Sequence, residues 1–173
     1  MRVLIVHESL YGSNRKIAQA IASGIGADAA TTIVEAQAAP STIDVDIDLI
    51  VVGGPNHKAG LPSPTSRAEA AADGDGTLRP AERGLREWLE GLRLDRPGQP
   101  AAVWDTRMAA PRILDVFDRG AATIARRLRR AGARLVGRPQ KYYSADGVGA
   151  LVAGEEDRAR AWGAELASLM RHR

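Results

Sequence analysis

The chain has no cysteine, so disulfide bonds, thiolate metal sites and catalytic thiols are excluded. It also lacks any run of about 18 apolar residues, the length that a membrane-spanning helix needs. Met1-Arg2, followed by the apolar residues 3–6, shows neither the long apolar stretch nor the small-residue cleavage site of a signal peptide. These absences favour a cytoplasmic protein. A length of 173 residues predicts one domain, 1–173, with one well-buried core.

Acidic residues are missing between Asp118 and Asp146, although the whole chain carries a net charge of only +3. The basic residues of that stretch are Arg119, Arg126, Arg127, Arg129, Arg130, Arg134, Arg138 and Lys141. Such a block can attract an acidic partner, nucleic acid or an anionic membrane. The alternative is an ordinary solvated helix face, which we favour, so nucleic acid is not expected as a partner.

Apolar runs alternate with amphipathic segments along the chain. Strands are predicted at 2–7, 31–36, 48–53, 101–104 and 134–136, the last resuming around Tyr142 after an interruption. Helices are predicted at 14–25, 80–91, 120–131 and from about 155 to the C-terminus. This alternation predicts an α/β fold, a doubly wound parallel sheet of five strands with helices on both faces. In such sheets ligands bind at the carboxyl ends of the strands, where the strand order reverses.

The stretch 59–79 differs in composition, with many Gly, Pro, Ser and Asp residues. It offers one predicted helical turn, at 67–72. A connection of this length inside a compact domain is usually a functional lid or a disordered segment. We therefore predict a lid-like insertion at 59–79.

The loop after the first strand, 7–15, is the strongest candidate for a binding site. It joins a buried strand to a helix, and a helix N-terminus attracts phosphate because its backbone N–H groups are unpaired and its dipole end is positive. Ser9, Ser13 and Asn14 add polar side chains, and Gly12 allows close approach to the backbone. An ordinary helix cap with Ser13 as the N-cap residue is the alternative. Because a cap needs one such residue and this loop has several, we favour a phosphate site.

Two common nucleotide-binding motifs are absent from this loop. The pattern Gly-x-x-x-x-Gly-Lys-Ser/Thr does not occur, and Gly-x-Gly-x-x-Gly does not follow the first strand. P-loop and Rossmann-type binding are therefore excluded.

The first loop resembles a motif of the flavodoxin family. Ser9-Leu10-Tyr11-Gly12-Ser13-Asn14 is similar to the family's phosphate loop in the variant Ser-x-Tyr/Phe-Gly-Asn-Thr, which Ser9, Tyr11 and Gly12 match. Val52-Gly53-Gly54-Pro55-Asn56-His57 resembles the family's turn beside the flavin ring. Trp104-Asp105-Thr106-Arg107-Met108 corresponds in position to the loop after the family's fourth strand. By element order, the likeness extends over essentially the whole chain.

The resemblance implies a flavodoxin-like fold with strand order 2-1-3-4-5 and FMN as the cofactor. The residues that it places at the cofactor are Ser9, Tyr11, Gly12, Ser13, Asn14, Pro55, Asn56, His57, Thr106 and Arg107. Trp88, Trp104 and Trp162 are predicted to lie in the core and not against the flavin. No metal site and no acid–base catalytic pair is predicted.

The expected function is that of an FMN-binding redox protein. It would transfer electrons or reduce a quinone-like acceptor, with a partner protein or a nicotinamide or quinone molecule as its redox partner. A signalling receiver module of the same topology is disfavoured, because the acidic positions it needs hold His7-Glu8 and Gly53-Gly54. A flavin-free protein of this fold that acts through its basic face remains the alternative.

Overall fold

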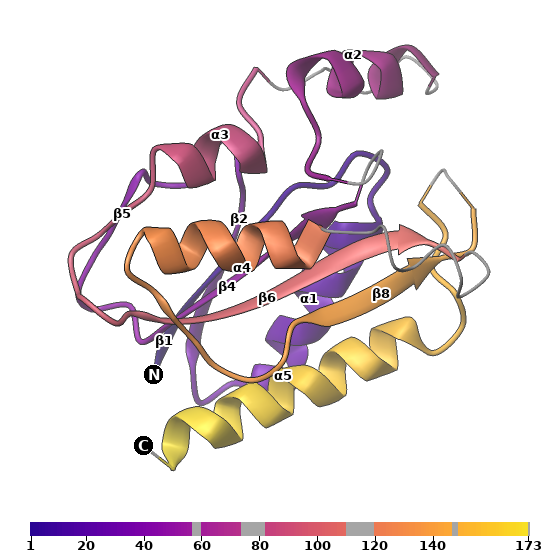
Figure 1. Cartoon of the computed structure of the whole chain (residues 1–173). Coiled ribbons are helices and arrows are strands. Elements are labelled where there is room, and N and C mark those ends of the chain that lie inside the picture. Colours follow the sequence, from indigo (N-terminus) through magenta and orange to yellow (C-terminus); the bar gives the residue numbers. More distant parts are fainter. Residues whose placement is uncertain (57–59, 74–81, 110–119, 147–148, 173) are drawn as a thin grey trace.

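The computed structural model describes residues 1–56, 60–73, 82–109, 120–146 and 149–172 (Figure 1). The strands are β1 (Arg2–His7), β2 (Ala30–Glu35), β3 (Thr42–Ile43), β4 (Leu49–Pro55), β5 (Arg93–Leu94), β6 (Pro100–Met108), β7 (Arg134–Leu135) and β8 (Gln140–Ser144). The helices are α1 (Ser13–Ile25), α2 (Pro64–Asp73), α3 (Leu85–Glu90), α4 (Gly120–Arg130) and α5 (Glu155–Arg171).

The centre of the fold is a parallel sheet with the order β2-β1-β4-β6, in which β7 and β8 both pair with β6. This is the predicted order 2-1-3-4-5, which is therefore confirmed. The count differs, because the sheet has six strands and not five. Between β7 and β8 the chain passes through Gly137, with φ of 69°, and Pro139, which has no N–H to donate, so the fifth strand is split. A small additional sheet, β3 with β5, was not predicted.

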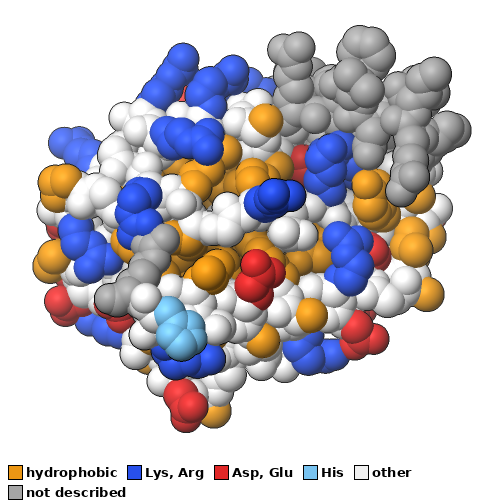
Figure 2. Space-filling view, turned by 60° about the horizontal axis from the view of Figure 1, so that its bottom comes forward, with side chains coloured by type: hydrophobic (Ala, Val, Ile, Leu, Met, Phe, Trp, Pro, Cys, Tyr) orange, Lys and Arg blue, Asp and Glu red, His pale blue; other side chains and the backbone are white. Residues whose placement is uncertain are grey.

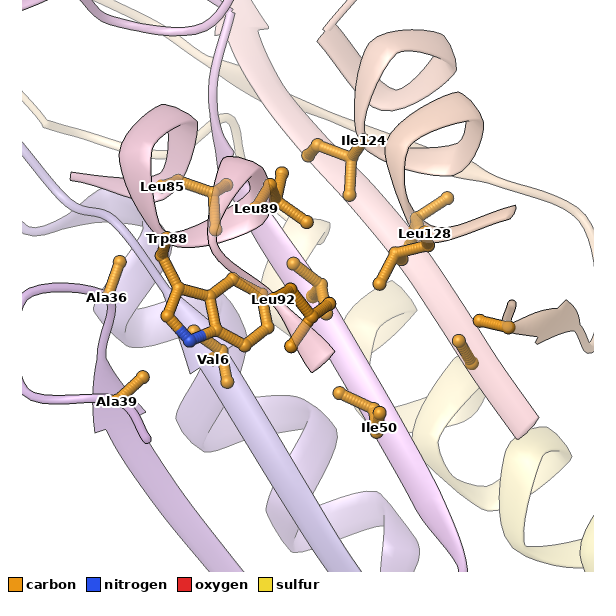
Figure 3. Packing of buried hydrophobic residues seen from close by; sticks show 14 of the residues in the cluster. Val6, Ala36, Ala39, Ile50, Leu85, Trp88, Leu89, Leu92, Ile124 and Leu128 are labelled. Atoms are coloured by element: carbon orange, nitrogen blue, oxygen red, sulfur yellow. The ribbon is translucent and has the colours of Figure 1, made fainter. Parts of the chain in front are cut away.

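Two hydrophobic cores cover the two faces of the sheet. Leu85, Trp88 and Ile124 from α3 and α4 pack on one face, as Figure 3 shows. Helices α1 and α5 pack on the other, where Trp104 and Trp162 are buried. The predicted core positions of the three tryptophans are thus confirmed, with exposed fractions of 0–4%.

Helix α1 is held firmly by α5. A Cβ built on Gly24 would lie 1.9 Å from the carbonyl oxygen of Arg160, and one on Gly163 would lie 2.2 Å from that of Ile21. Only glycine permits this approach of the two backbones. The packing fixes the axis of α1 and therefore the position of its N-terminus at the edge of the sheet.

Of the predicted lid-like insertion 59–79, residues 59 and 74–79 lie outside the described residues, and the described part contains more helix than the single turn predicted at 67–72. Helix α2 spans Pro64–Asp73 and lies at the top of Figure 1, on the side of α3. Helix α3 begins at Leu85, because Gly84 is extended and Glu87 accepts its N–H at 2.7 Å. The predicted helix start at 80 lies outside the described residues. Within the described part of the chain, none of the helices has the length and apolar character needed to cross a membrane.

Candidate functional site

The N-terminus of α1 lies where the strand order reverses, between β1 and β4. Its N-cap residue, Gly12, is left-handed with φ of 89°, and a Cβ built on it would meet nothing within 4 Å. The first turn of α1 contains no acidic residue. Unpaired N–H groups and the positive end of the helix dipole are thus available to an anion there.

The N-terminus of α5 can be compared with that of α1. Its N-cap, Gly154, has nearly the same conformation as Gly12, with φ of 87°. Its first turn, however, carries Glu155, Glu156 and Asp157, which balance the positive end of that helix. The two helices begin in the same way, but of the two only α1 has no acidic residue in its own first turn.

A pocket of about 300 Å³, which we call the switch-point pocket, adjoins the N-terminus of α1. Six residues predicted at the cofactor line it: Tyr11, Ser13, Pro55, Asn56, Thr106 and Arg107. The remaining lining residues, not predicted from sequence, are Leu10, Met108, Ser144, Asp146 and Gly149. The structure therefore brings together side chains from three predicted loops and adds the end of β8, for which the sequence offered no motif.

Asn14 lies behind this pocket, with an exposed fraction of 1%. Its Oδ1 accepts hydrogen bonds from Trp104 Nε1 at 3.0 Å and from Thr106 Oγ1 at 2.6 Å. Because an indole N–H can only donate, the facing Asn14 atom is the oxygen, and Nδ2 is the buried atom without a partner among the described residues. Asn14 was predicted at the cofactor as one of the polar side chains of the loop. In the structure its Oδ1 links α1 to β6.

Arg107 lines the pocket, and its guanidinium forms a buried ion pair with Asp105. Its guanidinium binds Asp105 with Nη2 2.6 Å from Oδ2, and Asp105 also accepts the Ala121 N–H at 2.7 Å. Burial raises the pKa of Asp105, while Arg107 and the Ala121 amide counteract that rise. The pair anchors the carboxyl end of β6 to the start of α4.

The other predicted residues are placed differently. Ser9 does not line the switch-point pocket; its Oγ accepts the Arg15 N–H at 3.4 Å and it faces a second cavity beside β2. Arg15 pairs with Glu35 across the ends of α1 and β2. Gly12 forms the start of α1, as expected. His57 lies outside the described residues.

A buried ion pair beside this loop was not predicted. Arg67 of α2 is 2% exposed and lies 3.5 Å from Glu8 Oε1 and 2.9 Å from Glu87 Oε2. Glu8 Oε2 accepts the Leu85 N–H at 2.8 Å. Burial raises the pKa of Glu8, whereas the Gly84 amide and Arg67 lower that of Glu87 although its partial burial acts in the opposite direction. In sequence, Glu8 and Arg67 are 59 positions apart, so no local pattern links them.

The residues present fit FMN in two respects. The open N-terminus of α1 and the Ser13 side chain provide donors for a phosphate. Asn56, which also lines the pocket, has a buried acceptor, Oδ1, without a partner among the described residues, and such an acceptor suits an N–H of a ring. The pocket lies at the lower end of the usual volume range for cofactor sites.

No protein-family model and no curated protein matches the chain. Among solved structures, it is similar to flavodoxin 1 from Bacillus cereus, with 16% identity and a TM-score of 0.66 over 100% of this chain and 99% of that one. A flavodoxin from the domain Archaea gives 14% identity and a TM-score of 0.64 over 99% and 100% of the two chains. A flavodoxin, WrbA-like protein from Agrobacterium tumefaciens gives 16% identity and a TM-score of 0.58 over 99% of this chain and 97% of that one. At these identities the likeness shows the fold, which is flavodoxin-like.

Proposed function

We propose that the chain binds FMN in the switch-point pocket and acts as a redox protein. The observation that carries the proposal is the N-terminus of α1: a left-handed glycine N-cap, a first turn without acidic residues and an adjoining pocket at the reversal of strand order. The flavodoxin-like fold supports the same location, because ligands of such sheets bind at this reversal.

Different residues would hold the phosphate and the flavin ring of FMN. The backbone N–H groups at the start of α1, with Ser13, would hold the phosphate. Tyr11, Pro55 and Asn56 would lie along the flavin, and Asn56 Oδ1 would accept one of its N–H groups. Thr106 would form the wall between the ring and Asn14. FMN, when bound, supplies the electron or hydride chemistry, and the chain supplies binding and orientation.

The proposal also extends to the electron acceptor and the redox partner. We propose electron transfer or reduction of a quinone-like acceptor in the cytoplasm, with a redox protein or a nicotinamide or quinone molecule as partner.

The arginines of α4 do not all point freely into solvent, since Arg127 binds Glu90 and the carbonyl oxygen of Arg86. On the face that Figure 2 shows, Lys and Arg side chains lie among acidic and hydrophobic ones and do not form one patch. Both observations favour a solvated basic surface over a nucleic-acid site.

A pair of glycine variants tests the proposal. Gly12→Ala should strain the left-handed N-cap and lower the FMN affinity at least tenfold, because it disturbs the backbone that would hold the phosphate. Gly154→Ala is the matched control, with the same substitution, the same N-cap position and nearly the same φ on α5. It should lower stability by a similar amount and leave the affinity unchanged.

The measurement is the quenching of FMN fluorescence during titration of the flavin-free protein. Equal affinities for Gly12→Ala and Gly154→Ala would contradict the placement of the phosphate. If the purified protein is colourless and binds no added FMN, the flavin-free alternative is correct.

A further inference from the structure

The second cavity, which we call the β2-side pocket, has a volume of about 140 Å³. It lies at the carboxyl ends of β1 and β2, where His7 and Glu35 end their strands. Ala70 and Ala71 of α2 cover it. Leu10 lines both this pocket and the switch-point pocket, so the first loop forms the wall between them. A cavity of about 150 Å³ accommodates a molecule of roughly the size of benzene.

One residue that lines this pocket has a buried polar atom without a partner among the described residues. His7 is 3% exposed, and its Nδ1 has no hydrogen-bond partner among the described residues. Burial lowers the pKa of the imidazole, so the ring is neutral at pH 7 and has one donor and one acceptor nitrogen. A buried polar group of this kind is costly unless something binds it.

The charged walls favour an anion. Both oxygens of each wall carboxylate already have donors: Glu8 accepts from Arg67 and from the Leu85 N–H, and Glu35 accepts from Arg15 and Gln37. Arg67 is occupied by Glu8, Glu87 and carbonyl oxygens, but the guanidinium groups of Arg15 and Arg83 are less fully used, since each carries five N–H donors. Within the part of the chain that the structure describes, the Arg15 side chain donates to Glu35 and the Arg83 side chain to Ser41. The pocket therefore has three arginines beside two carboxylates that are already paired.

The pocket is also held in shape before a ligand binds. Arg67 fixes α2 to the strand end through Glu8 and to α3 through Glu87. Ala36, Ala70 and Ala71 contribute small apolar surfaces opposite the charged groups. The lining of the pocket thus suits a short molecule with an anionic end and an apolar body.

We propose that the β2-side pocket binds a small organic carboxylate. The carboxylate group would accept hydrogen bonds from His7 Nδ1 and from Arg15 or Arg83, and the apolar part would lie against Ala36 and Ala71. This site is distinct from the proposed FMN site, since Leu10 is the only described residue that lines both pockets.

The probe is butyrate, with butyramide as its neutral counterpart of the same shape. We expect butyrate to shift the amide NMR signals of the pocket residues, His7 and Ala36 among them, in the full-length protein without phosphate in the buffer. Butyramide should bind at least tenfold more weakly, because it cannot provide the charge-assisted bonds. Equal binding of both compounds, or no shifts with either because the pocket holds water only, would overturn the proposal.

A pair of variants on α2 tests the location. Ala71→Leu places a larger side chain in the pocket without changing any charge, and it should abolish the amide NMR shifts that butyrate induces. Ala72→Leu is the matched control, since Ala72 is the next residue of the same helix and is exposed. It should bind butyrate like the unaltered protein. Butyrate binding that survives Ala71→Leu places the carboxylate elsewhere and contradicts the proposal.

Discussion

The indole N–H of Trp104 donates to Oδ1 of Asn14 at 3.0 Å, and this bond joins the first turn of α1 to β6 across the sheet. Thr106 donates to the same oxygen. A single buried amide therefore holds the start of α1 at a fixed distance from the strand end that forms the far wall of the switch-point pocket.

Replacement of Asn14 should be costly. In Asn14→Ala the Trp104 N–H and the Thr106 O–H lose their buried acceptor, at about 1–3 kcal/mol for each unsatisfied group. We expect the free energy of unfolding to fall by about 2–4 kcal/mol in urea titrations. Ser13→Ala, at the neighbouring position, is the control and should change it by less than about 1 kcal/mol. Similar losses for the two variants would show that the Asn14 link contributes little.

The Arg67–Glu8 pair should be needed for the attachment of α2. Arg67→Met leaves Glu8 buried without its counter-charge, and breaking a buried pair in this way costs about 3–5 kcal/mol. The double variant Glu8→Gln/Arg67→Met should regain most of that loss, because Glu87, the other partner of Arg67, is partly exposed and keeps the Gly84 N–H. Arg160→Met removes an exposed pair with Asp157 and should cost less than about 1 kcal/mol. Thermal and urea unfolding of the three proteins provide the comparison, and a double variant as unstable as the single one would refute this account.

Stability should fall on mild acidification because of His7. Burial lowers the pKa of this imidazole in the folded protein; Glu35 opposes the effect and Arg15 adds to it. In the unfolded chain the ring takes up a proton near pH 6.5. As the pH falls below this value the unfolded state binds more protons, so the His7 contribution to stability is complete above pH 6.5 and is lost as the pH falls through the folded-state pKa.

The test compares urea unfolding at about pH 7.5 and pH 5.5 for the unaltered protein and for His7→Gln. The unaltered protein should lose up to about 1.4 kcal/mol per pH unit more than the variant over the range between the two pKa values. The same pH dependence in both proteins would show that other groups cause it.

The order of the strands was implied by the resemblance to the flavodoxin family. Patterns within short segments predicted the strands, the helices and the core tryptophans, because buried strands and amphipathic helices have their periodicity in the sequence. They also located the first loop at the end of β1. The directions of the side chains in that loop were not predictable. Ser9 faces the β2-side pocket because its Oγ binds the Arg15 amide, and Asn14 faces inward because Trp104 binds it from 90 positions away. The partner of Asn14 is so distant in sequence that it leaves no local pattern.

The most direct test of the proposed function compares FMN with riboflavin, which lacks the phosphate. Two charge-assisted hydrogen bonds at the start of α1, at about 1.5 kcal/mol each, amount to roughly a 100-fold difference in affinity. Tyr11 is the only aromatic residue that lines the switch-point pocket within the described chain, so we expect FMN to bind loosely enough to be partly lost during purification. Titration of the flavin-free protein with both compounds, followed by flavin fluorescence, should give binding of FMN about 100-fold tighter than that of riboflavin. Equal affinities for the two flavins, or no binding of either, would contradict the account.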